Sequence, residues 1–238
     1  MATDLPAAAV FKTDVPAELS ISAEAAARFE EMYQAAQGDP GRVPWARAGT
    51  DPLLLRWLNS QARSLVRPGC RAVVVGCGLG DDVVELGERG FDVVGFDISP
   101  CAVHWAAQRH PRHAERFVVA DLLAPPTRLL KRFDLVVEIR TIQSLAPCAR
   151  CAVAAAVANL LCPRGVLLAI ARGRDGSRPL DEFVSQPWPL TRAELVELFE
   201  PHGLGTLNGA NGIEEVVEPG RDGAPPVQRL CATFVRAE

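Results

Sequence analysis

The sequence lacks the features that mark nucleic-acid-binding, membrane-spanning and secreted proteins. Its 238 residues carry a net charge of −4, whereas binding to a phosphate backbone needs concentrated positive charge. The most apolar run, residues 151–162, is too short to span a bilayer and suits a buried helix. The first residues contain prolines and acids where a signal peptide has a basic start and a long apolar run. These absences predict a globular cytoplasmic protein without a nucleic-acid or membrane partner.

The chain also lacks the patterns of disulfide frameworks and metal sites. Seven cysteines are an odd number outside any small, disulfide-rich context, so reduced thiols are expected. Cys148 and Cys151 form a single CxxC without the second ligand pair of a zinc site, and we interpret them as ordinary thiols at a helix start. The four histidines show neither HExxH nor HxH spacing. No metal is therefore predicted.

Apolar segments alternate with helical segments from about residue 70 onward. The expected strands are residues 72–76, 92–97, 116–121, 133–139 and 165–172, followed by a last pair around 212–218 and 227–237. Strands that are apolar throughout and separated by helices indicate a mostly parallel sheet with helices on both faces. The turn-rich segment PGRDGAPP predicts that the last two strands form an antiparallel hairpin at the sheet edge. The expected fold is therefore α/β and Rossmann-like, with seven strands.

The chain is long enough to bury a substantial core as effectively one domain. Two helices are expected ahead of the sheet, over residues 23–37 and from residue 52 onward. We expect residues 1–55 to form a helical cap and residues 56–238 to form the main domain. Residues 172–190, which have no clear period, are expected to act as a substrate lid.

The strongest local feature is the segment AVVVGCGLGDD. Gly76, Gly78 and Gly80 end a strand and open a helix, so a ligand can approach the backbone closely. A dinucleotide-binding turn would have its third glycine where Asp81 stands, beside Asp82, and two carboxylates there would repel a pyrophosphate. S-adenosylmethionine has no phosphate, and its ammonium and sulfonium groups suit nearby acids. Its carboxylate can use free backbone amides.

Acidic residues end the strands that follow the glycine turn. Asp97 lies 97 − 76 = 21 residues after the first glycine, where an acid can bind ribose hydroxyls. Asp121 ends the third strand, and Glu138 lies near the end of the fourth. The carboxyl ends of parallel strands meet at one edge of the sheet, where ligands of such sheets bind. Together these positions predict an acidic nucleoside site.

These motifs carry a resemblance to a known family. GCGLG, GFDIS, VVADLL and FDLVVEI resemble, in order and spacing, the cofactor motifs of class I S-adenosylmethionine-dependent methyltransferases. The stretch FEEMYQ…VPWARAGTDPLL and the later EIRTIQSLAP are similar, more weakly, to segments of the thiopurine, thiol-halide and tellurite methyltransferase group. The motifs cover about residues 70 to 140, and the looser likeness covers most of the chain. The resemblance implies methyl transfer by in-line displacement to a small-molecule acceptor.

The resemblance also implies which residues bind the cofactor. The set is Trp45, Gly76, Cys77, Gly78, Gly80, Asp97, Ile98, Ser99, Asp121, Leu122, Glu138 and Ile139. The glycines would wrap the methionine end, and Asp97 would bind ribose with Ile98 and Ser99 beside the adenine. Asp121 and Leu122 would address the adenine amine and face.

Two further residues of this set would lie near the sulfonium, and one would cover the cofactor. Glu138 and Ile139 would line the pocket beside the sulfonium. Trp45 would lie over the cofactor from the amino-terminal cap. Alternatively, Trp45 is a hydrophobic plug between cap and sheet, because an aromatic residue that anchors a cap gives the same pattern.

The acceptor side departs from the group's pattern. In that group an aspartate is followed quickly by arginine and glycine, whereas here Glu138 precedes Ile139 and Arg140. Arg140 either contacts an anionic acceptor or pairs with a neighbouring acid such as Glu138. Glu138 and Arg140 are the candidates for a catalytic role. The candidate substrate contacts are Arg140, Arg172, Phe183 and Trp188, of which the last three could instead belong to a simple surface loop.

Two readings from other classes remain at the level of sequence. An NAD-dependent oxidoreductase would share the glycine turn and Asp97, but Asp81 and Asp82 count against it. A non-catalytic nucleoside-binding protein of the same fold would not need the acids of the pocket. The assembly is expected to be a monomer or homodimer.

Overall fold

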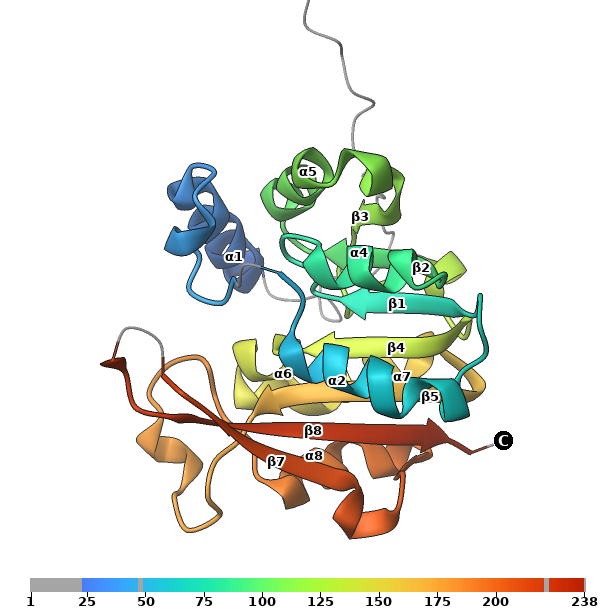
Figure 1. The fold of residues 1–238 in the computed structure, drawn as a ribbon. Helices are drawn as coiled ribbons and strands as arrows, with labels where there is room; N and C mark the ends of the chain where they lie inside the picture. Colours follow the sequence, from blue (N-terminus) through green and yellow to red (C-terminus); the bar gives the residue numbers. More distant parts are fainter. Residues whose placement is uncertain (1–22, 47–48, 221–222, 238) are drawn as a thin grey trace, which may run out of the picture.

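A single sheet of eight strands forms the centre of the computed structural model, which describes residues 23–46, 49–220 and 223–237 (Figure 1). The strands are β1 (Arg71–Val75), β2 (Asp92–Asp97), β3 (Phe117–Val119), β4 (Phe133–Ile139), β5 (Leu161–Arg172), β6 (Leu204–Thr206), β7 (Ile213–Glu218) and β8 (Val227–Arg236). Their order is β3-β2-β1-β4-β5-β8-β6, and β7 also pairs with β8. The first five strands pair in parallel, which confirms the predicted mostly parallel sheet.

The carboxyl-terminal part of the sheet is antiparallel, as predicted, but contains an additional strand. β8 pairs on one side with β5 and on the other with β6 and β7. Thr206 of β6 lies opposite Phe234, and Ile213 of β7 lies opposite Ala232, so the two short strands occupy successive parts of one edge. β7 and β8 form the predicted antiparallel pair, and β7 lies at the edge of the sheet because β8 also pairs with β5. Three residues of β6 are too few to show a strand period in the sequence.

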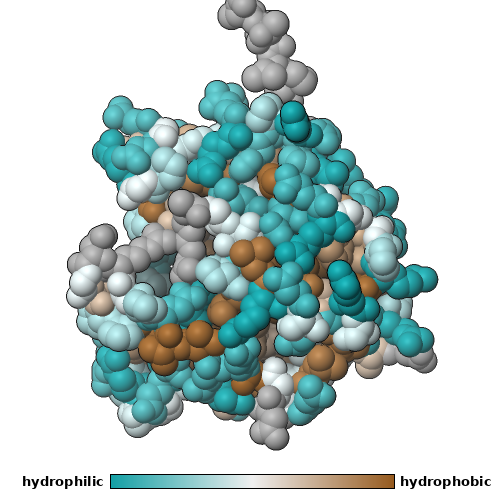
Figure 2. Space-filling model, in the orientation of Figure 1, coloured by the Kyte–Doolittle hydropathy of each residue, from teal (hydrophilic) through white to brown (hydrophobic). Residues whose placement is uncertain are grey.

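Helices cover both faces of the sheet. They are α1 (Ala23–Ala36), α2 (Pro52–Ser60), α3 (Ala62–Leu65), α4 (Asp81–Glu88), α5 (Pro100–Arg109), α6 (Thr141–Ser144), α7 (Arg150–Leu160) and α8 (Arg192–Phe199). Side chains of β1 alternate between two buried clusters, because successive residues of a strand point to opposite faces. Val73 and Val75 pack with α7 and α8, whereas Ala72 and Val74 pack with α2, α4 and α5. In Figure 2, hydrophilic side chains cover most of the visible face, and the apolar patches between them are small.

The amino-terminal elements differ in what they pack against. α1 packs on α5, where Tyr33 and Trp105 meet edge to face with ring centroids 6.5 Å apart. α2 instead packs on the sheet, with Trp57 in its main core. The boundary predicted at residue 55 therefore falls inside α2, and residues 1–22 of the predicted cap lie outside the described residues. No helix within the described ranges is long and apolar enough to cross a membrane.

The sheet reverses its strand order between β1 and β4. From β1 the chain builds outward through β2 and β3, then returns to add β4 and β5 on the other side. Figure 1 shows the arrowheads of β1, β4 and β5 pointing toward the side where α1 and α6 lie. Parallel sheets bind ligands in the crevice at the carboxyl ends of such strands, so this edge is where a site is expected.

Candidate active site

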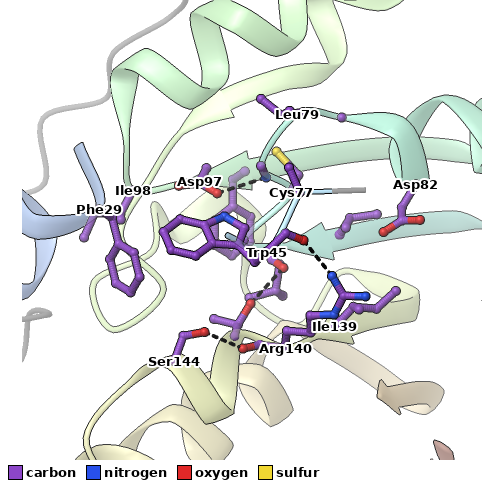
Figure 3. Close-up of a pocket in the computed structure, with 18 of the residues that line it drawn as sticks. Phe29, Trp45, Cys77, Leu79, Asp82, Asp97, Ile98, Ile139, Arg140 and Ser144 are labelled. Carbon is purple, nitrogen blue, oxygen red and sulfur yellow. Dashed lines mark hydrogen bonds between the residues drawn. The ribbon is translucent and has the colours of Figure 1, made fainter. Parts of the chain in front are cut away.

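A pocket lies at this edge, between the sheet and the cap (Figure 3). The residues predicted from the sequence that line it are Trp45, Gly76, Cys77, Gly78, Gly80, Asp97, Ile98, Leu122, Ile139 and Arg140. They come from β2 and β4 and from the turns after β1, β2, β3 and β4, with Trp45 contributed by the cap. The same pocket contains two residues of α1 that the sequence analysis did not single out, Phe29 and Tyr33.

The glycine turn has a backbone shape that requires glycine. Gly76, Gly78 and Gly80 have φ values of 59°, 51° and 88°, in the left-handed region that other residues rarely adopt. Space is also restricted, because a Cβ on Gly80 would lie 2.6 Å from the Phe117 ring. A Cβ on Gly76 would collide with the Thr141 hydroxyl. The chain can therefore pass close to a ligand only with glycine at these positions.

Asp97 is held in place by backbone amides. Its Oδ2 accepts a hydrogen bond from the Gly78 amide at 3.0 Å, and its Oδ1 accepts one from the Ser99 amide at 3.0 Å. Burial raises the pKa of Asp97, and these amide hydrogen bonds oppose that shift. The Gly78 amide is consequently not a free donor for a ligand, contrary to the general expectation for this turn. The carboxylate itself lies at the pocket wall in a fixed orientation.

Ser99 is not among the residues that line the pocket. Its side chain is fully buried and caps α5 by accepting from the Ala102 amide at 3.0 Å. The Ser99 hydroxyl donates to Glu30 Oε2 of α1 at 2.6 Å. Its place corrects the predicted contact, because the helix cap takes the side chain away from the pocket. Ser99 joins the cap helix to the loop that carries Asp97.

The loop after β3 contributes one of its two predicted residues to the pocket. Leu122 lines the pocket and is 3% exposed. Asp121 lies outside the lining and accepts a hydrogen bond from the Leu123 amide at 2.8 Å. The predicted contact of Asp121 with adenine is therefore corrected, since this acid stabilises the turn that presents Leu122.

Glu138 is likewise outside the pocket lining, which corrects its predicted place. Adjacent strand residues point to opposite faces, and Ile139 is the one that faces the pocket. The fully buried Glu138 carboxyl turns to the start of α6, where Oε1 accepts from the Ile142 amide at 2.9 Å. Oε2 has no hydrogen-bond partner among the described residues. Burial raises the pKa of Glu138 to about 7, and its hydrogen bond with the Ile142 amide connects the end of β4 to the start of α6.

Arg140 lines the pocket but pairs with an acid other than Glu138. Its Nη2 donates to Asp51 Oδ2 at 3.0 Å, and its Nη1 donates to the Trp45 carbonyl at 2.7 Å. Asp51 also accepts from Arg229 Nη2 at 2.9 Å. Arg140 adopts a φ of 69°, a left-handed conformation that the surrounding contacts must stabilise. The guanidinium therefore fastens the cap segment to the end of β4.

Trp45 both lines the pocket and packs against side chains of the cap. It lines the pocket, and its ring meets those of Phe29 and Tyr33 edge to face, at 5.8 and 5.7 Å between centroids. Its indole Nε1 donates to the Tyr33 hydroxyl at 2.8 Å. Figure 3 shows the Trp45 indole beside the Phe29 ring. The sequence spacing FEEMY, which places Phe29 and Tyr33 four residues apart on one helix face, could have indicated this aromatic wall.

The three substrate candidates after β5 do not line this pocket. The Arg172 amide donates to the Gln143 side-chain oxygen, and the Trp188 amide donates to the Gln143 carbonyl at 2.8 Å. The Arg178 guanidinium lies over the Phe183 ring, 5.0 Å from the ring centroid. The substrate roles of Arg172, Phe183 and Trp188 stay predictions, since these residues lie outside the lining of this pocket.

The charge of the pocket is predominantly negative. Asp51, Asp81, Asp82 and Asp97 line it, but Asp51 is paired with Arg140 and Arg229, and Asp81 with Arg109. Asp82 and Asp97 are the lining acids that have no ion-pair partner among the described residues. Burial raises the pKa of Asp82 to about 6, so this acid remains largely ionised at neutral pH. Such a rim attracts positively charged ligand groups and repels phosphates.

Comparisons with known proteins agree with this geometry. A family described as a methyltransferase domain matches residues 73–167. Thiocyanate methyltransferase 1 from Arabidopsis thaliana is 31% identical over 172 residues, which cover 70% of this chain and 70% of that protein. The chain belongs to the class I S-adenosylmethionine-dependent methyltransferases.

Other class I methyltransferases match in part of their length or in fold. Magnesium-protoporphyrin O-methyltransferase from Rhodobacter capsulatus is 43% identical over 74 residues, which cover 30% of this chain and 32% of that protein. The structure of 1,6-didemethyltoxoflavin-N1-methyltransferase from Burkholderia thailandensis has a TM-score of 0.65 at 21% identity and covers 100% of this chain and 99% of that chain. The latter shares the fold of this methyltransferase.

The pocket of this methyltransferase fits its cofactor class. The glycine turn leaves a cradle that a Cβ on Gly78 would narrow, at 3.0 Å from the Tyr33 hydroxyl. The carboxylates of Asp82 and Asp97 suit the ammonium and sulfonium groups of S-adenosylmethionine. They do not suit the pyrophosphate of NAD, the cofactor of the alternative reading from the sequence.

Proposed function

We propose that this protein transfers the methyl group of S-adenosylmethionine to a small soft nucleophile, such as a thiol or thiocyanate. The observation that carries the cofactor assignment is the acidic pocket built around the glycine turn at the reversal of strand order. The relatives named as thiocyanate and thiol methyltransferases support the acceptor class.

We assign the cofactor contacts to residues that line the pocket. Gly76, Gly78 and Gly80 would wrap the methionine end, and Asp97 would accept hydrogen bonds from the ribose hydroxyls. The adenine would lie between apolar side chains that include Ile98 and Leu122. Of the remaining predicted residues, Ile139 would lie near the sulfonium and Trp45 over the cofactor.

The chain mainly supplies alignment and a dry pocket. When bound, S-adenosylmethionine provides a methyl group on a sulfonium, which is a good leaving group. Phe29, Tyr33 and Trp45 exclude water from the cap side, and the contacts of Arg140 with Asp51 and Trp45 keep this wall in place. Orienting two reactants for in-line displacement contributes on the order of 7–11 kcal/mol.

The side chains at the α6 end of the pocket favour an acceptor that needs little activation. Thr141, Ser144 and Leu145 line this end, and the described lining residues include no histidine or lysine. A thiol with a pKa near ~8.5 already provides some thiolate at neutral pH, and thiocyanate has no proton that a base must remove. Amines and phenols depend more strongly on a general base. This difference favours the soft nucleophile.

Calorimetry and an acceptor screen test these assignments. Wild-type protein should bind S-adenosylmethionine and S-adenosylhomocysteine but not NAD. Release of S-adenosylhomocysteine should then be measured with thiols, thiocyanate, carboxylates, phenols and amines. Binding of NAD alone would refute the cofactor assignment. Turnover of amines or phenols without turnover of thiols or thiocyanate would refute the acceptor assignment.

We further propose that the segment 172–190 forms a lid outside the acceptor side of the pocket. Arg28 Nη2 of α1 donates to Gln186 Oε1 at 3.0 Å, which links the segment to the cap helix. We also propose a cytoplasmic monomer or homodimer that acts without a nucleic-acid or membrane partner. Light scattering after size-exclusion chromatography distinguishes the two assemblies.

A further inference from the structure

The single tyrosine of the chain has a hydroxyl proton for which the described residues supply no acceptor. Tyr33 is 3% exposed and lines the pocket from α1. Its oxygen accepts from Trp45 Nε1 at 2.8 Å, and the indole nitrogen can only donate. The phenol must therefore use its own proton elsewhere. No acceptor for this proton is present among the described residues, which is unusual for a buried polar group.

The Tyr33 hydroxyl is fixed above the glycine turn. A Cβ built on Gly78 would lie 3.0 Å from the hydroxyl oxygen, which places this oxygen directly over the bend. Edge-to-face contacts with Trp45 and Trp105, at 5.7 and 6.5 Å between ring centroids, hold the phenol ring on two sides. The unused donor is therefore at a defined position in the pocket.

The surrounding charges leave a ligand carboxylate with few other donors. Asp82 and Asp97, which have no ion-pair partner among the described residues, line the pocket and would repel a carboxylate. The guanidinium of Arg140 is already engaged by Asp51 and the Trp45 carbonyl, and the Gly78 amide donates to Asp97. A neutral donor over the turn adds no positive charge that would repel the ammonium and sulfonium groups of the same ligand.

We propose that Tyr33 binds the α-carboxylate of S-adenosylmethionine by donating its hydroxyl hydrogen bond, with Trp45 fixing the direction of that bond. This inference rests on the proposed function, because it assigns one more contact of the same cofactor. Burial raises the pKa of Tyr33 well above its ordinary value, so the phenol stays protonated as a donor.

The test compares Tyr33→Phe with wild type for ligands that differ in the carboxylate. The variant keeps the ring and removes only the hydroxyl. Calorimetry with S-adenosylmethionine and S-adenosylhomocysteine should show a loss of affinity of roughly 10- to 100-fold, as for a hydrogen bond to a charged group. Decarboxylated S-adenosylmethionine, which lacks the carboxylate, should bind both proteins within about 2-fold, because the deleted bond has no partner there.

Two further variants separate hydrogen bonding from packing. Phe29→Leu changes an apolar neighbour in the same wall and should weaken all three ligands equally. Trp45→Phe removes the donor that orients the phenol, and part of the carboxylate-dependent loss should appear in this variant. If Tyr33→Phe fails to fold, as judged by circular dichroism, Trp45→Phe carries the same comparison.

The outcomes distinguish this inference from the proposed function. If wild type binds S-adenosylmethionine and Tyr33→Phe weakens all three ligands equally, or none of them, the role of Tyr33 is refuted and the function stands. If wild type binds none of the three ligands, the proposed function fails and the inference fails with it.

Discussion

Replacing Asp51 by asparagine should strongly destabilise the protein. Asp51 and Arg229 are each 3% exposed, and Asp51 Oδ2 accepts from both Arg229 and Arg140. Asparagine keeps the shape of the side chain and can keep the cap hydrogen bond from the Leu53 amide to Oδ1. The substitution therefore removes chiefly the charge that faces two guanidinium groups.

The expected loss follows from what each arginine retains. Breaking a buried ion pair by removing one partner costs about 3–5 kcal/mol. Arg229 still contacts Glu218 at 3.1 Å, and Arg140 still donates to the Trp45 carbonyl, so the lower end of this range applies. A loss of about 3 kcal/mol corresponds to a fall in Tm of roughly 6–12 °C for a domain of this size.

Urea and thermal unfolding at pH 7 measure this loss, with Asp39→Asn as the matched control. Asp39 also caps a helical turn, accepting from the Gly41 amide at 2.9 Å, but it is exposed, and no arginine among the described residues contacts its carboxylate. The control should cost less than about 1 kcal/mol. A loss for Asp51→Asn no larger than that of the control would refute the reasoning about the buried charges.

The pH dependence of the Asp51→Asn effect has a defined sign. Burial alone would raise the pKa of Asp51, but the Arg229 and Arg140 guanidinium groups outweigh it and hold the pKa below its ordinary value of 3.8. A lowered pKa gives stability that is present above about pH 4 and is lost as the pH falls through the folded-state pKa. The difference between wild type and variant should therefore shrink in strong acid.

Three further substitutions test the turn, the wall and the ribose contact. Gly80→Ala should lower the free energy of unfolding in urea by about 1–3 kcal/mol more than Gly90→Ala. The φ values of Gly80 and Gly90 are similar, at 88° and 90°, but only a methyl group on Gly80 would collide with another side chain, the Phe117 ring. Equal losses in the two variants would contradict this. The stability of Glu138→Gln relative to wild type should rise by up to about 3 kcal/mol between pH 4.5 and pH 8. The folded-state pKa of Glu138 is about 7, so wild type loses stability as the pH rises through that range. An unchanged difference in Tm between the two proteins at the two pH values would contradict this. Asp97→Asn should weaken S-adenosylmethionine binding about tenfold or more by calorimetry, and unchanged affinity would exclude the ribose contact.

The sheet and the glycine turn could be predicted because their signals are local. Parallel strands buried on both faces are apolar throughout, and the turn after β1 needs three glycines with positive φ. Asp97 was found for the same reason, since it ends a strand beside that turn. Each of these features is set by a few neighbouring residues.

Other parts of the site depend on contacts that the sequence does not display. Arg140 and its partner Asp51 are 89 positions apart, so the neighbouring Glu138 was the obvious but wrong candidate for the ion pair. Which of Glu138 and Ile139 faces the pocket depends on the parity of β4 against its neighbours. An acid at a strand end therefore predicts the edge of the sheet on which it lies, but not the direction in which its side chain points.

The cap supplies what the sheet edge lacks. The glycine turn and Asp97 form one side of the pocket, and the other side consists of Phe29, Tyr33 and Trp45, which come from before the first strand. Asp51 and Arg140 connect that side to the end of β4 through buried charge. A change in this connection should therefore alter both stability and the enclosure of the cofactor, whereas a change in β6 or β7 should alter stability alone. The sheet edge by itself presents only the cofactor side of the pocket. The acceptor preference is thus expected to depend on how the cap is positioned over that edge.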